Sequence, residues 1–396
     1  MKILMVSNFV VFPWEGGNSR FTYILDNLNC DEHDVELVTS SFFHFAKKTR
    51  KQEELKKTPY KVTLIDEPGY EKNVSLKRFY SHYKLGKNLE KYLKSMKEKP
   101  DVIYCAIPSL DMAKVAAKYA KKNKIRFIID VQDLWPEAFK MVFKMPLVSN
   151  VIFYPINKTA NYIYKAADEI IAVSETYANR AVVVNNKYKN KLSVFLGTEL
   201  ENFDKIEKKK KEKEDEIVLT YIGTLGHSYN LSDTIKALKI LQDKGYNNLK
   251  FKIMGAGPLK ENFEELIKQL NVNAEMTGRL PYEKMVQELC ACDIAINPIM
   301  KGAAQSIINK VGDYAAAGLP VVSTQECPEY RNLIDNKKIG LNCENDPVDI
   351  AEKIEKLIND SELRNKMGKN NRKLAEEKFD RKKTYKEIVE LILKDA

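Results

Sequence analysis

The stretch KGAAQSIINKVGDYAAAGLPVVST, residues Lys301–Thr324, decides the fold of the second half of the chain. It predicts a loop, a helix, a stop and a buried strand. Gln305, Asn309 and Asp313 are spaced i, i+4 and i+8, which places them on one helical face. Gly318 can end the helix, and the apolar residues that follow it begin a strand.

This segment carries residue types that suit a phosphate. The N-terminus of a helix offers free N–H groups and the positive end of a dipole. The sequence places that N-terminus at Gln305–Ile307, with Lys310 in the second turn and Asp313 one turn further. A cation and a carboxylate at this spacing suit a nucleotide diphosphate with a ribose beyond it. The alternative is an amphipathic surface helix that carries a salt bridge.

The composition is typical of a soluble globular protein of about two domains. The chain has 396 residues, of which 44% are hydrophobic and 30% charged. No apolar run approaches the roughly 18–20 residues of a membrane span. The start, MKILMVSNFVVFPW, has no small-residue cleavage site and predicts a first strand, not a signal peptide. The six cysteines form no metal-ligand pattern and indicate buried thiols in a reducing cytoplasm.

The net charge of +10 lies entirely in the first half of the chain. Residues 1–200 carry 32 basic and 22 acidic side chains, whereas residues 201–396 carry 33 of each. Residues 42–99 hold 16 basic and 7 acidic residues, interleaved with the aromatic residues Phe42, Phe43, Phe45, Phe79, Tyr80, Tyr83 and Tyr92. Such a surface attracts anionic lipid headgroups, pyrophosphate-linked substrates or nucleic acid. The alternative is a solvated, lysine-rich face.

Strands alternate with helices in two successive runs, which predicts an α/β fold with two doubly wound parallel sheets. The segment Lys205–Glu216 separates the runs, and eleven of its twelve residues are charged. We therefore expect domains at residues 1–200 and 201–380, followed by a final segment at 381–396 that contains the helix Arg381–Leu393. In such folds a ligand binds at the carboxyl edge of the strands, here in the cleft between the domains.

Glycine-bearing loops follow several predicted strands. Gly16-Gly17 follow the first strand, and Ile222–Gly226, Met254–Pro258 and Gly278–Pro281 follow strands of the second half. Glycine lets backbone N–H groups approach a phosphate closely. None of these loops has the GxGxxG or Walker A pattern, so each can also be an ordinary turn.

Polar and aromatic residues gather in IDVQDLWPE, residues Ile129–Glu137, at the end of another predicted strand. A carboxylate at Asp130 or Asp133 can take a proton from an acceptor hydroxyl, and Trp135 can pack on a sugar face. The alternative is a helix N-cap at Asp133. The sequence has no Asp-x-Asp, HExxH or Ser-His-Asp arrangement.

These features resemble the retaining glycosyltransferases of family 4, in particular the bacterial branch that builds O-antigen, capsule and other envelope glycans. The resemblance covers essentially the whole chain and rests on Gly16-Gly17, Asp133–Glu137, Ala167–Ser174, Ile217–Gly223 with Gly226, Phe251–Pro258, Thr277–Pro281 and Lys301–Thr324. It implies the GT-B fold, in which two Rossmann-like domains face a central cleft. The first domain would bind the acceptor, the second the nucleotide sugar, and the final helix would cross back to the first.

The resemblance also implies a role for each matching residue. Lys310 would hold the donor diphosphate, Asp313 the ribose, and the main chain of Arg279 and Leu280 would frame the base. The other implied donor-binding residues are Gly16, Gly17, Gly223, Gly226, Gly255, Ala304, Gln305, Ser306 and Ile307. The implied acceptor-binding residues are Gln132 and Trp135, and the catalytic candidates are Asp133, Asp130 and Lys310.

Four positions depart from the family pattern. Gln305 and Asp313 stand where relatives have a spaced pair of acids, usually Glu. Thr224 replaces the basic residue that is usual after Gly223, so we expect Lys310 to carry more of the phosphate charge alone. Many relatives have His at the position of Gln132.

The resemblance implies transfer of a hexose or N-acetylhexosamine from a UDP-linked donor to a lipid-linked glycan in envelope polysaccharide synthesis. No metal or other cofactor is expected. The basic first domain would contact the anionic inner face of the plasma membrane, through Lys47, Lys48, Arg50 and Lys51 among others.

Two alternatives stay open. A sugar-nucleotide epimerase shares the fold but needs cleft acids and histidines, and the chain has four histidines. A nucleic-acid binder would fit the sequence pI of about 9.0. Against it, the second half is neutral and carries no nucleic-acid-binding motif.

Overall fold

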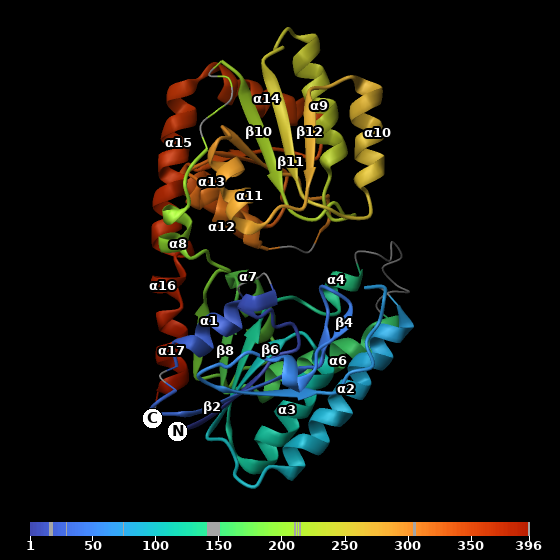
Figure 1. The fold of residues 1–396 in the computed structure, drawn as a ribbon, viewed down its shortest axis with the longest axis vertical. Helices are drawn as coiled ribbons and strands as arrows, with labels where there is room; N and C mark the ends of the chain where they lie inside the picture. The colour runs from blue at the N-terminus through green and yellow to red at the C-terminus, as the bar shows by residue number, and fades with distance from the viewer. Residues whose placement is uncertain are drawn as a thin grey trace. The chain divides into compact units, whose positions relative to one another are not determined.

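The computed structural model describes residues 1–15, 19–28, 30–73, 75–140, 151–209, 211, 213, 215–303 and 306–394. The chain divides into two compact units (Figure 1). Unit 1 comprises Met1–Val194 with Tyr385–Ala396, and unit 2 comprises Phe195–Thr384. Each unit is an α/β domain built on one parallel sheet, as the alternating pattern predicted. Within the ranges just given, no helix is long and apolar enough to span a membrane.

Unit 1 has a seven-stranded sheet in the order β5-β2-β1-β6-β7-β8-β9 (Figure 1). The winding direction reverses between β1 and β6, as in doubly wound folds. The strands are β1 (Lys2–Val6), β2 (Asp34–Ser40), β5 (Lys61–Ile65), β6 (Val102–Ile107), β7 (Arg126–Val131), β8 (Glu169–Ala172) and β9 (Asn190–Ser193), with a hairpin of β3 (Phe42–Phe43) and β4 (Lys48–Thr49). The helices are α1 (Arg20–Asp26), α2 (Leu76–Ser95), α3 (Leu110–Asn123), α4 (Glu137–Lys140), α6 (Tyr154–Ala166), α7 (Glu175–Val182) and α17 (Lys386–Leu393), with short turns η1 (Pro13–Glu15) and η2 (Gln52–Glu54).

The central strands of unit 1 are buried on both faces. All six residues of β6, VIYCAI, are buried, which is the pattern of a parallel strand covered by helices on both sides. The helix α17 joins this core from the end of the chain through the buried Ile388 and Ile392. Arg126 fixes its end by donating hydrogen bonds to the carbonyl oxygens of Leu391 (2.6 Å) and Lys394 (2.8 Å). The C-terminal helix is therefore part of unit 1.

Unit 2 has a six-stranded sheet in the order β12-β11-β10-β13-β14-β15 (Figure 1). The strands are β10 (Ile217–Ile222), β11 (Leu249–Met254), β12 (Ala274–Gly278), β13 (Ile294–Asn297), β14 (Val321–Ser323) and β15 (Gly340–Asn342). The helices are α8 (Leu200–Lys205), α9 (Leu231–Asp243), α10 (Lys260–Leu270), α11 (Tyr282–Cys290), α12 (Asn309–Ala316), α13 (Pro328–Lys337), α14 (Pro347–Asn359), α15 (Ser361–Leu374) and α16 (Arg381–Thr384), with a π-helical turn η3 (Ala375–Phe379).

The switch point of unit 2 lies between β10 and β13. These strands part beyond the pair Thr220 and Ala295, the last in their register. The hydroxyl of Tyr314, on α12, fills the gap: it accepts a hydrogen bond from the amide of Ile222 (3.0 Å) and donates one to the carbonyl oxygen of Ile296 (3.1 Å). Because Tyr314 is fully buried, this contact fixes α12 beside the carboxyl ends of both strands.

The structure differs from the sequence expectation in a few elements. The predicted helix Arg381–Leu393 is two helices, α16 and α17, with the buried Tyr385 between them. Unit 1 ends at Val194 and resumes at Tyr385, a few residues from the boundaries expected at 200 and 381. The sequence also gave no signal for several short elements whose few residues show little periodicity: α7, β9, α8, α13 and β15.

Candidate active site

Lys310 lies in the first turn of α12, and its residue is only 7% exposed. Its Nζ lies 3.9 Å from the ring centroid of Tyr221 and 3.8 Å from that of Tyr229. Within the part of the chain that the structure describes, this nitrogen has no hydrogen-bond partner. Burial without a counter-charge lowers the pKa of Lys310 well below its usual value, and the aromatic faces offset only part of that cost. The site therefore suits an anion from outside the chain.

Backbone loops close around this lysine. Gly223 has φ of +136°, and a Cβ there would lie 3.2 Å from Lys310 Nζ. A Cβ on Gly255 would lie 1.8 Å from the carbonyl oxygen of Gly223, and one on Gly257 would lie 2.3 Å from that of Leu225. The glycines at 255 and 257 thus let the loops after β10 and β11 pack backbone against backbone. This packing is sufficient reason for a glycine at 255.

Asp313 lies one turn after Lys310 on α12 and is half-buried. Its Oδ1 accepts hydrogen bonds from the hydroxyls of Thr198 and Tyr282, both at 3.0 Å. Burial raises the pKa of this carboxyl, although the two hydroxyls lower it. With Oδ1 held in place, Oδ2 can accept a hydrogen bond from a ligand hydroxyl.

The helix that carries Lys310 is shorter than the sequence predicted. It begins at Asn309, so the N-terminus expected at Gln305–Ile307 is wrong and Lys310 lies in the first turn. Ile307 is buried in the apolar core of unit 2, and the side-chain amide of Gln325 donates to the carbonyl oxygen of Ser306 at 2.5 Å. These contacts hold the chain outside helical geometry before the helix starts.

Of the other predicted donor-binding residues, the structure describes three and leaves four outside its described ranges. Arg279 is exposed, Leu280 packs against the core cluster that contains Tyr314, and a Cβ on Gly226 would make only an ordinary contact of 3.6 Å. Packing therefore does not demand a glycine at 226. The remaining four lie outside the described residues: Gly16, Gly17, Ala304 and Gln305.

In unit 1, Asp130 is fully buried near the end of β7. Its Oδ2 accepts hydrogen bonds from Arg20 Nε at 2.7 Å and from the Tyr104 hydroxyl. Its Oδ1 accepts one from Gln132 Nε2 at 2.7 Å, and Arg20 also donates to the carbonyl oxygen of Val194 at 2.8 Å. Both carboxylate oxygens are occupied inside the fold, and so is the amide of Gln132. Asp130 therefore anchors α1.

Asp133 has a different environment. Its oxygens accept hydrogen bonds from the Leu134 amide (2.9 Å) and from the indole N–H of Trp135 (3.2 Å). Burial raises the pKa of Asp133 to about 6, although these hydrogen bonds and nearby Arg78 lower it. A carboxylate with such a pKa changes its charge near neutral pH, which suits a general base.

A cluster that the sequence analysis did not identify surrounds Trp135, and we call it the aromatic cluster. The ring of His82 stacks on Trp135, with centroids 5.8 Å apart and an interplanar angle of 3°. Burial and nearby cations lower the pKa of His44 and His82 to about 3, so both are neutral. The sequence could have indicated this cluster only by the positions of its residues, most of which follow a strand or lie on α2. The members of the aromatic cluster are Phe9, His44, Tyr70, Arg78, His82 and Trp135.

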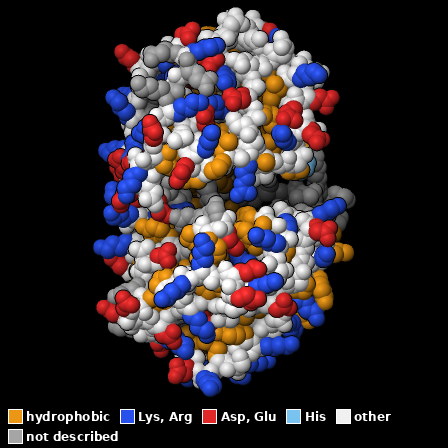
Figure 2. Space-filling model, in the orientation of Figure 1, with side chains coloured by type: hydrophobic (Ala, Val, Ile, Leu, Met, Phe, Trp, Pro, Cys, Tyr) orange, Lys and Arg blue, Asp and Glu red, His pale blue; other side chains and the backbone are white. Residues whose placement is uncertain are grey.

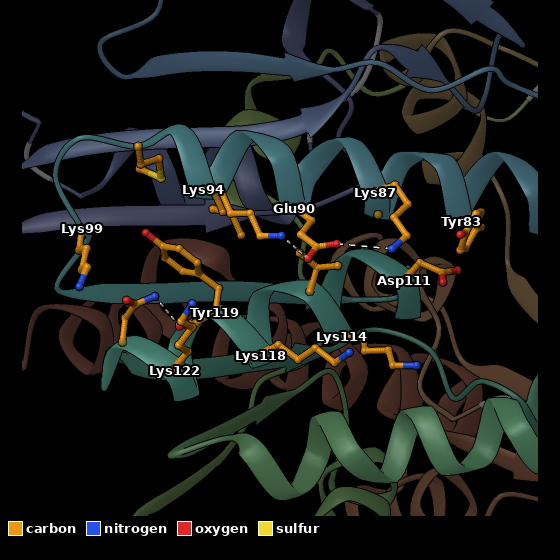
Figure 3. A pocket seen from close by; sticks show the side chains of 15 residues that line it. Tyr83, Lys87, Glu90, Lys94, Lys99, Asp111, Lys114, Lys118, Tyr119 and Lys122 are labelled. Carbon is orange, nitrogen blue, oxygen red and sulfur yellow. Dashed lines mark hydrogen bonds and ion pairs between the residues drawn. The ribbon is translucent and has the colours of Figure 1, made fainter.

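A groove of about 450 Å³ lies between α2 and α3 of unit 1 (Figure 3). Lys87 and Lys94 both approach Glu90, at 3.6 and 2.8 Å. Four more lysines line the groove, and within the described residues none of them has a carboxylate in ion-pair distance: Lys99, Lys114, Lys118 and Lys122. The groove is therefore mainly cationic.

Only part of the predicted basic and aromatic surface is exposed. Arg50 is buried and ion-paired with Glu15 at 2.6 Å, and Phe42 and Phe43 are buried too, so the surface role expected of these residues is wrong. On the face drawn in Figure 2, basic and acidic side chains are interspersed, with no continuous basic patch of the kind a nucleic-acid binder presents. Within residues 42–99, the exposed large apolar side chains are Phe45, Leu76, Phe79, Tyr80 and Tyr83.

No group of three or more His, Cys, Asp or Glu side chains among the described residues is arranged to hold a metal ion. All six cysteines are free thiols. Cys105, Cys292 and Cys343 are buried, and the other three are partly exposed.

Comparison with known proteins finds glycosyltransferases similar to this chain. Residues 202–374, which lie within unit 2, match the family described as "Glycosyl transferases group 1". The chain is 27% identical over 306 residues to the capsular polysaccharide biosynthesis glycosyltransferase CapM of Staphylococcus aureus, covering 74% of this chain and 76% of that protein.

A second relative matches nearly the whole chain. It is the GalNAc-α-(1→4)-GalNAc-α-(1→3)-diNAcBac-PP-undecaprenol α-1,4-N-acetyl-D-galactosaminyltransferase of Campylobacter jejuni, 23% identical over 379 residues and covering 93% of this chain and 92% of that protein. Among solved structures, HepE of Anabaena in complex with UDP is similar with a TM-score of 0.69 at 14% identity, covering 99% of each chain.

The chain is therefore a glycosyltransferase, an enzyme of the transferase class, with the GT-B fold of two Rossmann-like domains. One of its relatives is named for capsular polysaccharide biosynthesis. Because the named relatives are transferases, they favour group transfer over the epimerase alternative.

Proposed function

We propose that this enzyme is a retaining glycosyltransferase that moves a hexose or N-acetylhexosamine from a UDP-linked donor to a lipid-linked glycan in cell-envelope polysaccharide synthesis. The observation that carries the proposal is Lys310, buried between two tyrosine rings without a hydrogen-bond partner in the described chain. A donor diphosphate supplies the missing counter-charge. The bound UDP of HepE and the undecaprenol-linked substrate in the name of the Campylobacter relative support the two substrate classes.

Unit 2 would bind the donor. The diphosphate would contact Lys310 and the backbone of the loop after β10, and the ribose would contact Oδ2 of Asp313. Departure of UDP leaves an oxocarbenium-like sugar and places negative charge on the leaving diphosphate. A fixed ammonium in a buried site stabilises that charge electrostatically, so the reaction would need no divalent metal.

Unit 1 would bind the acceptor. Asp133 can accept a hydrogen bond from the acceptor hydroxyl. Trp135 is only 7% exposed, with His82 and Arg78 against its ring, so its part would be to support these side chains. Attack on the face from which UDP departs retains the anomeric configuration, with an oxygen of the leaving phosphate helping to take the hydroxyl proton.

A lipid-linked acceptor would bring the enzyme to the inner face of the plasma membrane. The exposed apolar side chains of α2 and the lysine-lined groove beside them suit an anionic bilayer surface. Glu at Lys48 and Lys51, which are both exposed, together with Ser at Leu76 and Tyr80, should weaken binding to phosphatidylglycerol vesicles in a flotation assay. Unchanged flotation would remove the membrane part of the proposal.

The donor is tested by ligand-linked stability. UDP at about 100 times its dissociation constant should stabilise the fold by about 2.7 kcal/mol, whereas GDP should have little effect. The Lys310→Met variant should lose this stabilisation. Stabilisation by GDP alone would contradict the UDP assignment. Nuclear magnetic resonance of the product should show the anomeric configuration of the donor, and an inverted product would contradict retention.

A further inference from the structure

Two cations of unit 1 converge on the same pair of neighbours. Arg78, on α2, places its guanidinium 5.4 Å from the ring centroid of Tyr70 and donates from Nη1 to the carbonyl oxygen of Asn73 at 2.7 Å. Lys47 places Nζ 4.7 Å from the same ring and 2.6 Å from Oδ1 of Asn73. Arg78 also lies over the Trp135 ring, at 4.8 Å. Both cations are therefore positioned before any ligand arrives.

Neither cation is neutralised within the described chain. No carboxylate of the described residues lies within 4.0 Å of Lys47 or Arg78, and the buried Nε of Arg78 has no hydrogen-bond partner. Asp133 and Glu67 act on Arg78 only from beyond that distance, and each accepts hydrogen bonds from other groups. Burial lowers the pKa of Arg78, and burial together with Arg78 lowers the pKa of Lys47. Leaving two such charges unpaired costs stability unless an anion joins them.

We propose that Arg78 and Lys47 bind the diphosphate that links the acceptor glycan to its lipid, with the buried Trp135 ring supporting the guanidinium of Arg78. A guanidinium binds phosphate oxygens with two parallel hydrogen bonds, and an ammonium adds a compact charge. A diphosphate diester carries one negative charge on each phosphate, which matches one cation each. This inference rests on the proposed function, because it takes the acceptor to be lipid-linked.

The test uses the full chain saturated with UDP, so that the donor site is filled. Farnesyl diphosphate and inorganic pyrophosphate are titrated by calorimetry into the wild type and into Arg78→Met, Arg78→Lys and Lys47→Met. The matched control is Lys77→Met, which removes one charge at the next position of α2, where Lys77 is 61% exposed and pairs with Glu71 at the surface.

We expect Arg78→Met to weaken farnesyl diphosphate binding by about 10- to 100-fold, the usual effect of losing charge-assisted hydrogen bonds. Lys47→Met should weaken farnesyl diphosphate binding by about tenfold. Arg78→Lys should have an effect between those of Lys47→Met and Arg78→Met, because it keeps the charge and loses the two parallel hydrogen bonds of the guanidinium. Lys77→Met should bind like the wild type, and UDP affinity should not change in any variant. If Arg78→Met lowers the melting temperature so far that the variant is not folded in the assay, the comparison rests on Arg78→Lys and Lys47→Met.

Several results would overturn the inference. One is equal loss of affinity in Lys77→Met and Arg78→Met, and another is no binding of farnesyl diphosphate to the wild type. Weaker flotation with phosphatidylglycerol vesicles in Arg78→Met, with farnesyl diphosphate binding intact, would assign the cations to lipid headgroups instead. The UDP titration separates this inference from the proposed function. Absence of UDP binding contradicts the proposed function, whereas normal UDP binding with no effect of Arg78 contradicts only the acceptor subsite.

Discussion

Arg20 in unit 1 and Lys310 in unit 2 are both buried cations near the ends of strands, and they differ in whether the fold supplies a counter-charge. In unit 1, Arg20 is ion-paired with Asp130 at 2.7 Å, and both side chains are at most 1% exposed. In unit 2, Lys310 meets two tyrosine rings and no carboxylate of the described chain. Burial lowers the pKa of both cations, but Asp130 more than restores that of Arg20, whereas nothing restores that of Lys310.

Whether a buried cation has a counter-charge within the fold distinguishes a structural cation from one with a role in ligand binding. A buried charge that the chain itself neutralises belongs to the fold, because removing its partner leaves an uncompensated charge. A buried charge without a partner lowers the stability of the free protein, so folding alone gives no reason to keep it. The contrast predicts opposite outcomes for mutations at the two sites.

The largest effect is expected for Asp130→Asn. It would leave Arg20 buried without a counter-charge and lower the free energy of unfolding by about 3–5 kcal/mol. Urea denaturation measures this loss. The control is Asp34→Asn, which breaks an exposed pair with Lys2 and should cost less than about 1 kcal/mol. If the two variants lost equal stability, the buried pair would not be the anchor of unit 1.

The Lys310→Met variant should behave in the opposite way. Transfer from a UDP-linked sugar should fall by about 10²- to 10³-fold, because the charge on the leaving diphosphate loses its fixed counter-charge. The unfolding free energy without ligand should stay equal or rise, since the variant no longer buries an amine. Lys301→Met, an exposed lysine of the same segment, should change neither quantity. A loss of stability as large as that of Asp130→Asn would make Lys310 a structural residue.

The next effect separates Asp133 from Asp130. If Asp133 is the proposed acceptor base, it acts only as a carboxylate, so the transfer rate should fall as the pH drops below about 6, the pKa to which burial raises it. Asp133→Asn should lower kcat by about 10²-fold and remove this pH dependence. The measurement is a pH profile of kcat at saturating acceptor. If Asp130→Asn removed the dependence instead, the base would have to be reassigned.

The smallest effect is a coupling between donor binding and protons. In the unfolded chain Lys310 titrates near about 10.4, and in the free fold its pKa is lowered. The stability cost of the lysine is therefore absent above that pH and grows as the pH falls toward the folded pKa. A bound diphosphate raises the pKa again, so UDP binding should take up a fraction of a proton.

Calorimetry of UDP binding in buffers of different ionisation enthalpy measures that proton. In the Lys310→Met variant the unfolding free energy should depend less on pH through the alkaline range. Uptake that is zero at every pH would mean that Lys310 is already charged in the free protein.

The alternation of apolar strands and amphipathic helices predicted most of both sheets. A strand such as β6 is apolar along its whole length because helices cover both of its faces, and that pattern is visible in the sequence. The short helix α13 and the strand β15 gave too little periodicity to be found. The start of α12 was misplaced because contacts of Ser306 and Ile307 with residues far along the chain override their local tendency.

The sequence by itself determined that the chain forms two α/β domains and that Lys310 and Asp313 lie on one helix after a strand of the second. Local spacing is sufficient for this, because periodicity and helix registers are properties of neighbouring residues. Only the tertiary structure decided which charges are paired. Arg20 meets Asp130 from 110 residues away, and Arg50 forms a buried ion pair with Glu15. Among the residues that the structure describes, none supplies a carboxylate to Lys310. Pairing depends on where distant segments are brought together, and so does the desolvation that shifts each pKa.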